Sequence, residues 1–388
     1  MKVEIKKWAL LSLISALSCF GENSPFATQG LGLERSPRSV REIGLGYAGL
    51  SYVSKKGASL LNPSIMGFNT VTTFQGIIES GVNFIEDEAG KNALSGGTLP
   101  FLSFNFQAGI LGHLSFSYFQ RFNRNFSYVA TDSQKEEITS VTSGSNELIF
   151  GWGRTITKNF AVGASSNLLL GRDLSIRKTI YKDEKLKGLE GDTTEVRRSG
   201  FYPTLSAIFV EKKYSVAASA TFPFKFTEET QKSVYGQSSN KGKEQEFTLP
   251  TKVALGFTYR LKYNKTLVLD MVTTDWDQKI SDKMNRSFQV GLGYEFFKKR
   301  GLYDSYVSKI IYRVGVGYER LYVNEVNQFR LTTGLGLPLG KRGSVVDLAL
   351  EGGRRGSIAN DLIQENYVKL FVSMTGAGVW GNTRRVRR

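Results

Sequence analysis

The sequence predicts an all-β protein: a transmembrane antiparallel outer-membrane β-barrel of about 14 strands, with an N-terminal hatch in its lumen. Three observations predict this fold. Many short segments alternate apolar and polar residues, the connections between them alternate between tight and long, and no segment after the first twenty or so residues is apolar enough for a membrane helix. Lipid accepts only helices and closed sheets, so a chain without apolar helices can span a membrane only as a barrel.

Residues 1–21 have the order of a secretory signal peptide. Lys2, Lys6 and Lys7 precede an apolar run, Trp8 to Leu17, that is too short to span a bilayer, and small residues follow it. We therefore expect export to the bacterial outer membrane. Cys19, the only cysteine, lies in the expected cleavage region, so the mature chain has no disulfide and no thiolate metal site. Lipidation of Cys19 is the alternative to ordinary cleavage.

Residues 22–42 are polar and irregular, and they predict an exposed N-terminal arm. Residues 43–68 differ from both the arm and the strands. They are rich in small residues, are broken by Lys55-Lys56-Gly57 and close on Asn62-Pro63, which suits a compact folded insert better than a strand. We therefore predict a hatch, or plug, at 43–68.

Residues 69–380 are predicted to form the barrel wall, followed by a basic C-terminal tail at 381–388. The strand segments share alternation of an apolar face with a small or polar face. They lie near 69–80, 99–110, 113–128, 147–156, 159–172, 200–211, 214–226, 248–261, 265–276, 286–297, 308–320, 327–337, 343–354 and 365–380. In the clearest case Phe288, Val290, Leu292, Tyr294 and Phe296 alternate with Gln289, Gly291, Gly293 and Glu295. The count is even, as a barrel with both ends in the periplasm requires.

The connections after the second, fourth, sixth and eighth segments are tight, whereas Lys182 to Gly200 and Glu228 to Glu246 are long and polar. Short periplasmic turns and long external loops have this pattern. Pro203 removes a ladder donor, so it marks either a strand start or a kink in the wall. A pair of soluble β-sandwiches is the alternative fold, but the polar faces carry Gly, Ser, Thr, Gln and charges where a sandwich core would be apolar.

The sequence does not favour catalysis, and we expect no cofactor, metal or catalytic residue. Gly44, Gly46 and Gly49 fit a dinucleotide-binding spacing, but the preceding segment is charged and no acidic residue follows at the required distance. His113, the only histidine, lies in a tight turn predicted to be periplasmic. The net charge of +16 is scattered through loops and tail, which fits an anionic lipid surface better than nucleic acid.

The hatch carries a family resemblance. Gly44, Gly46, Gly49 and then Asn62-Pro63 resemble the N-terminal hatch of the long-chain fatty-acid transporter (FadL and TodX) family and of the related PorV, where a Gly/Ala-rich segment leads to Asn-Pro-Ala before the first strand. Ser64 replaces that alanine here. The resemblance implies a fourteen-strand barrel in which a hydrophobic molecule or lipid enters an apolar pocket and passes when the hatch shifts.

The first hypothesis is therefore a passive outer-membrane transporter for hydrophobic, fatty-acid-like compounds. Gly44, Gly46, Gly49, Asn62 and Pro63 are its expected gating residues. The second is a PorV-like accessory barrel that binds secreted protein partners, and the third is a purely structural or adhesive barrel.

Overall fold

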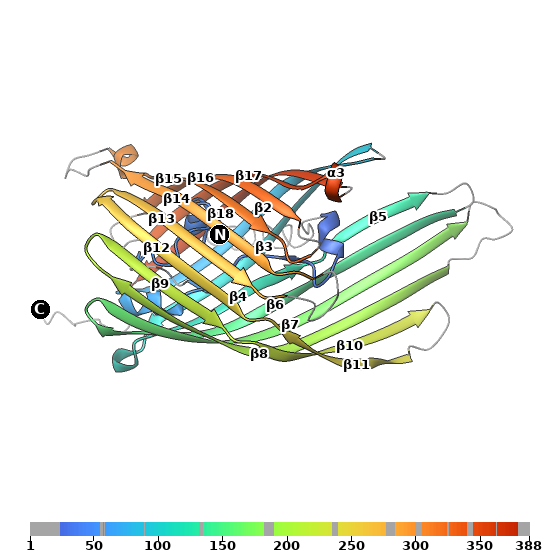
Figure 1. Ribbon diagram of the computed structural model, residues 1–388, viewed down its shortest axis with the longest axis horizontal. Coiled ribbons are helices and arrows are strands. Elements are labelled where there is room, and N and C mark those ends of the chain that lie inside the picture. Colours follow the sequence, from blue (N-terminus) through green and yellow to red (C-terminus); the bar gives the residue numbers. More distant parts are fainter. Residues whose placement is uncertain are drawn as a thin grey trace, which may run out of the picture.

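The protein is a closed antiparallel barrel of 14 strands, which confirms the predicted fold class (Figure 1). The computed structural model describes residues 24–54, 57, 59–88, 90–131, 135–181, 190–234, 240–276, 284–298, 305–323, 326–339, 344–361 and 363–378. The predicted signal peptide with Cys19 and the basic tail 381–388 lie outside these residues. Among the described residues, no helix has the length and apolar character needed to cross a membrane.

The wall contains eleven continuous strands and three that are each broken into two segments, counted from the element order. In chain order they are β2 (Thr72–Asp87), β3 (Gly90–Gln107), β4 (His113–Asn123) with β5 (Phe126–Thr131), β6 (Lys135–Thr157), β7 (Phe160–Tyr181), β8 (Glu190–Val210), β9 (Tyr214–Thr221) with β10 (Phe224–Val234), β11 (Asn240–Leu249) with β12 (Lys252–Lys262), β13 (Lys265–Thr274), β14 (Ser287–Phe297), β15 (Ile311–Arg320), β16 (Asn327–Leu339), β17 (Ser344–Ser357) and β18 (Ile363–Gly378).

The remaining elements are short. The lumen holds η1 (Pro25–Thr28), β1 (Leu33–Glu34), α2 (Val40–Ile43) and η2 (Pro63–Phe68), and the connections contain η3 (Gly109–Leu111), η5 (Tyr306–Lys309) and α3 (Ile358–Asp361).

The barrel closes where the last strand, β18, pairs with the first, β2, from Gly378 opposite Thr72 to Ile363 opposite Asp87. Both chain ends of the wall therefore lie at one end of the barrel, together with the tight β6–β7, β8–β9 and β12–β13 turns. In outer-membrane barrels this is the periplasmic end.

The alternating faces of the strands have the expected directions. In β14 the apolar residues point outward, with Phe288, Leu292 and Phe296 being 36%, 46% and 37% exposed. Gly291 and Gly293 point into the lumen, where hatch atoms contact them. The apolar core therefore lies between the wall and the luminal segments, and the apolar outer face suits lipid.

The long external connections are mostly strand, which corrects the loop assignment made from the sequence. Residues 190–200, 224–234 and 240–249 belong to β8, β10 and β11. Together with β5 and the distal ends of β6 and β7 they form a six-stranded sheet that projects beyond the rest of the barrel, at the right of Figure 1. We call this sheet the extension. Both of its faces lie outside lipid, so its sequence lacks the apolar alternation of the wall.

The N-terminal arm is buried, so the prediction of an exposed arm at 22–42 is wrong for the described residues 24–42. Ser24, Ala27, Arg38 and Val40 are at most 2% exposed. The arm lies in the lumen, and β1 pairs with β4 at Leu33 opposite Asn123. Its polar residues suggested solvent, but they are matched by polar groups of the wall.

The outward face of β14 provides a test of membrane insertion. Leu292→Arg places a charge at the centre of the strand and is expected to lower the free energy of unfolding in liposomes by about 2–4 kcal/mol. Urea titration of the folded fraction measures the change. Phe288→Arg, on the same face at the strand end, is the matched control and should cost only about 0–1 kcal/mol. Equal costs would contradict the assigned membrane depth.

Candidate functional site

A capped helix turn at the end of the arm leads into the hatch. In α2, Ser39 caps the N-terminus: its side chain accepts from the Glu42 N–H, and Glu42 accepts from the Ser39 N–H at 2.8 Å. This capping box starts a helix of only four residues. The chain then turns through Gly46, Tyr47 and Gly49, which have φ values of +68°, +67° and +146°. Glycine is favoured at such angles because it has no Cβ.

Glycines of the wall allow the hatch backbone to approach the strands directly. A Cβ on Gly291 would lie 2.2 Å from the Gly46 carbonyl oxygen, and one on Gly293 would lie 2.4 Å from the Leu45 carbonyl oxygen. A Cβ on Gly315 would lie 2.1 Å from the Gly46 nitrogen. The glycines that formed the small face of the predicted strands are therefore the docking surface of the hatch.

The Asn-Pro end of the hatch has its own seat on β6 and β7. The Asn62 side-chain amide donates to the Leu50 carbonyl at 2.6 Å, and its Oδ1 accepts from the Ser64 N–H at 3.2 Å, which caps η2. A Cβ on Gly153 would lie 2.4 Å from the Pro63 carbonyl oxygen, and one on Gly163 would lie 2.2 Å from the Ser64 nitrogen. Asn62 thus joins the two halves of the hatch.

Asp270, on β13, holds the middle of the hatch. Its Oδ2 accepts from the backbone N–H groups of Gly49 and Leu50 at 2.9 and 2.8 Å, and from Arg38 of the arm at 2.6 Å. Asp270 is 1% exposed. One buried carboxylate therefore binds both the arm and the hatch. A buried charge is tolerated only when it is paired and hydrogen-bonded in this way.

A second ionic cluster surrounds Glu295 of β14. Its carboxylate accepts from Arg41 of α2 at 3.2 Å and from Arg313 of β15 at 2.8 Å, and it also accepts from the Tyr52 hydroxyl. Arg313 in turn donates to Asp347 at 2.6 Å. The cluster thus links Arg41 and Tyr52 to side chains of β14, β15 and β17.

The arm is attached through further pairs at the external side of the hatch. Lys252 donates to Glu34 at 2.5 Å, and Arg121 does so at 3.4 Å. Burial alone would raise the pKa of the Glu34 carboxyl, but the two cations outweigh burial and the pKa lies below its usual value. Ser24 donates to Glu365 at 2.5 Å. Glu34 is therefore ionised at neutral pH and the arm stays paired.

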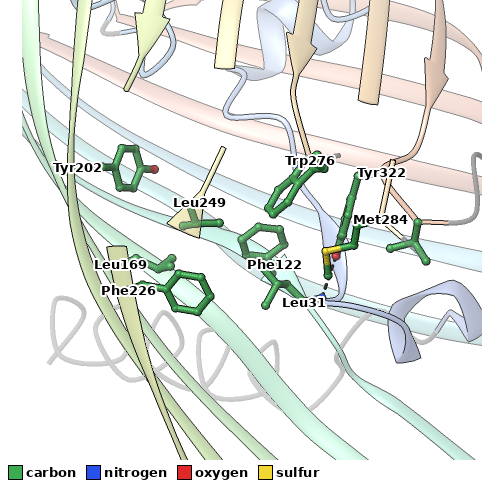
Figure 2. Close-up of a cluster of buried hydrophobic side chains, with 10 residues drawn as sticks. Leu31, Phe122, Leu169, Tyr202, Phe226, Leu249, Trp276, Met284 and Tyr322 are labelled. Carbon is green, nitrogen blue, oxygen red and sulfur yellow. Dashed lines mark hydrogen bonds between the residues drawn. The ribbon is translucent and has the colours of Figure 1, made fainter. Parts of the chain in front are cut away.

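An apolar cluster seals the external mouth of the lumen (Figure 2). It combines the arm, β4, the base of the extension and the β13–β14 and β15–β16 connections. Its buried members are Leu31, Phe122, Leu169, Tyr202, Phe226, Leu249, Trp276, Met284, Tyr322 and Val323. The Trp276 and Tyr322 rings stack with centroids 4.6 Å apart, and the Tyr322 hydroxyl donates to the Gly32 carbonyl at 2.6 Å.

A cavity of about 280 Å³ lies on the periplasmic side of the hatch. Its lining mixes apolar with charged side chains, including Leu45, Val53 and Ile65 of the hatch with Arg41 and Arg313. Another cavity of about 70 Å³ lies between the arm and the wall. Neither of these two cavities is the expected apolar pocket, because charged side chains line both.

The structure places Gly44 and Gly46 against wall backbone, whereas Gly49 packs on the Glu42 side chain and donates to Asp270 of the wall. Pro63 lies at the separate β6–β7 site, next to Asn62. Pro203 lies within β8, which continues through it in register with β7. The break is in the neighbouring strand instead, between β9 and β10, where the Phe222 N–H donates to the Pro203 carbonyl at 3.1 Å. His113 is buried at the start of β4.

The partners of the hatch on the wall were not predicted from the sequence. Asp270, Glu295 and Glu351 are single acidic residues on the polar faces of predicted strands, and that position was the only signal available. Glu351 accepts from the hydroxyl of Tyr47 at 2.7 Å.

A family model named BamG matches residues 2–386. The chain belongs to the BamG family. Comparison with curated proteins found no match.

Solved structures similar to this BamG-family chain share its fold. A Pseudomonas aeruginosa FadL homologue has a TM-score of 0.64 at 11% identity, covering 89% of this chain and 98% of that one. The Pseudomonas putida toluene transporter TodX has a TM-score of 0.56 at 11% identity, covering 86% and 97%. The Ralstonia pickettii toluene transporter TbuX has a TM-score of 0.53 at 14% identity, covering 92% and 98%. At these identities the likeness shows the outer-membrane barrel fold alone.

The wall glycines predict a steric test of hatch docking. Gly315→Val places side-chain atoms where the Gly46 nitrogen lies, so the loop must move, at a cost of about 1–3 kcal/mol as in overpacked cores. Amide hydrogen exchange at Leu45 and Gly46 is expected to accelerate. In Gly352→Val the new Cβ meets nothing within 4 Å. Unchanged exchange in both variants would contradict direct backbone docking.

Asp270→Asn tests the buried carboxylate. The substitution breaks the closer of the two ion pairs of buried Arg38 and leaves it only the Glu42 carboxylate, at 3.4 Å. Breaking a buried pair typically costs about 3–5 kcal/mol. Amide exchange at Gly49 and Leu50 is expected to rise, because both N–H groups lose a charged acceptor. Asp275→Asn is the control: its carboxylate pairs with Arg286 at 3.2 Å on the surface, where a pair contributes about 0–1 kcal/mol. Equal changes in stability and amide exchange in the two variants would show that Asp270 does not hold the hatch.

Proposed function

We propose that the protein is a passive outer-membrane transporter for hydrophobic, fatty-acid-like compounds, exported by its N-terminal signal peptide and gated by the hatch at 43–68. The observation that carries this proposal is the position of the hatch. It fills the lumen between the apolar cluster at the external mouth and the cavity of about 280 Å³ on the periplasmic side. Movement of this one segment would join the two.

The attachment of the hatch supports a movable element. Arg38 and Asp270 each keep buried polar atoms that have no hydrogen-bond partner among the described residues: Nε and Nη2 of the arginine and Oδ1 of the aspartate. Incompletely paired buried groups raise the free energy of the docked state. If the hatch moved and water entered the lumen, these atoms would form hydrogen bonds with water. That gain lowers the free energy needed to move the hatch.

The cavity lining supports a ligand with an apolar body and an acidic head. Leu45, Val53 and Ile65 offer apolar contact, and Arg41 and Arg313 offer guanidinium groups next to it. Pockets for drug-sized ligands typically measure about 300–1,000 Å³. The present cavity therefore holds only part of a long acyl chain until the hatch moves. TodX and TbuX are toluene transporters, and they support hydrophobic transport by analogy of fold alone.

A PorV-like accessory barrel that binds secreted protein partners is the second candidate function. The extension favours it, because six strands continue beyond the barrel on the external side and offer a surface that passage through the lumen does not need.

Mass spectrometry of the protein purified in mild detergent distinguishes the transporter from the accessory barrel. Stoichiometric bound lipid supports transport, whereas a co-purifying protein with an empty lumen supports the accessory role.

A reversible covalent lock tests the gate. The Ser51 hydroxyl of the hatch lies 2.7 Å from the Thr258 hydroxyl of β12, so Ser51→Cys with Thr258→Cys should form a disulfide, in a background with Cys19→Ser. Oxidation is expected to lower oleate uptake into liposomes by about tenfold or more, since a tethered hatch cannot leave the lumen. Reduction should restore uptake.

The matched control is a disulfide within the wall. Ser103 and Ser117 have hydroxyls 2.8 Å apart on β3 and β4, so Ser103→Cys with Ser117→Cys adds a bond of similar geometry that leaves the hatch free. Its oxidation should not change uptake. Uptake that survives the hatch lock would overturn gating by 43–68, and no oleate uptake by the unmodified protein would overturn the transporter.

A further inference from the structure

The extension has two edges. β5 pairs with β6 on one side, and β11 pairs with β10 on one side. Within the described ranges, no strand pairs with the other side of either one. The edge strand of a sheet presents a row of unpaired N–H and C=O groups, which is a template for another strand.

The two edges differ in charge. β11 has two lysines and two glutamates among its ten residues, Lys241, Lys243, Glu244 and Glu246, and the β10–β11 ladder also shifts register between Thr230 and Lys232. Charges and irregular pairing are the usual means of protecting an edge. The sequence of β5, FSYVAT, has no charge and no proline, and its pairing with β6 is regular. Only the β5 edge is unprotected.

The side chains of β5 suit a further strand. Tyr128 and Val129 are 45% and 53% exposed, and as neighbours in a strand they point to opposite faces. The Phe126 and Tyr128 rings lie 5.9 Å apart on one face. Aromatic and β-branched residues are favoured in strands because they pack against cross-strand neighbours. An added strand would therefore find apolar contacts on both faces.

We propose that the free edge of β5 binds a secreted or cell-surface protein by antiparallel strand addition, through an uncharged extended segment of that partner. Main-chain hydrogen bonds would supply affinity, and the uncharged β5 side chains would select against a charged segment, which would lose hydration without gaining a counter-ion. This proposal does not depend on transport through the lumen.

A second copy of the chain does not fit this edge. Two copies in one membrane face the same way, so their β5 strands leave the membrane in the same sense. Antiparallel pairing between them would require both strands to lie in the membrane plane, whereas strands of such barrels tilt by about 35–45° from the barrel axis. The occupant is therefore a different protein.

Site-specific photo-crosslinking tests the proposal with the full-length protein in cells of its own bacterium. A photoreactive amino acid is placed singly at Ser127, Val129 and Thr131. All three positions are expected to crosslink to one protein, at partner residues about two apart and in reverse order, because facing residues of an antiparallel ladder run in opposite directions. The same amino acid at Gln245 on β11 should give no adduct with that protein.

Substitution of the edge provides the second measurement. Val129→Lys, with the crosslinker at Ser127, is expected to lower the adduct yield by about tenfold, because charge blocks an edge. Gln245→Lys should leave the yield unchanged, and heat-modifiable gel migration verifies that both variants are folded. Adducts with lipid alone, with a second copy, or with partner residues in no reverse order would each overturn strand addition at β5.

Discussion

The close approach of two backbones is the contact on which the rest of the lumen depends. Leu45 and Gly46 lie against Gly291, Gly293 and Gly315 with no side chain between them. Large barrels enclose more space than their own side chains fill. Here the arm and the hatch occupy part of that space. Glycine on the wall brings that segment within reach of the acidic side chains on the same strands.

The acidic groups then determine where the segment sits. Asp270 and Glu295 each bind arginines of the arm or hatch, so a shifted hatch would leave several buried charges unpaired. Buried ion pairs contribute little net stability compared with apolar packing, but breaking one is costly. The lumen therefore gains a defined position for the hatch more than it gains overall stability. A position defined by few strong contacts is compatible with a two-state element.

The wall could be predicted from the sequence, whereas much of its contents could not. Alternation such as Phe288 to Phe296 is a local property, and lipid on one side enforces it. Beyond the membrane both faces of the extension contact water, so β10 and β11 lack the apolar–polar alternation and were predicted as loops. The arm was taken as exposed because Arg38 is charged, but its partner Asp270 is 232 residues away. Local composition does not reveal a pair so far apart in the sequence. For the same reason, the acidic residues of the wall were not among the predicted site residues.

Three strands are interrupted, between β4 and β5, between β9 and β10 and between β11 and β12. Among the described residues, only β6, β7 and β8 therefore run unbroken from the barrel into the extension. The Asn62-Pro63 end of the hatch lies on β6 and β7, against Gly153 and Gly163. The wall residues that contact the Asn62-Pro63 end are thus joined to the extension through two continuous strands. A force on the extension would therefore be transmitted through β6 and β7 to the wall residues on which the hatch rests.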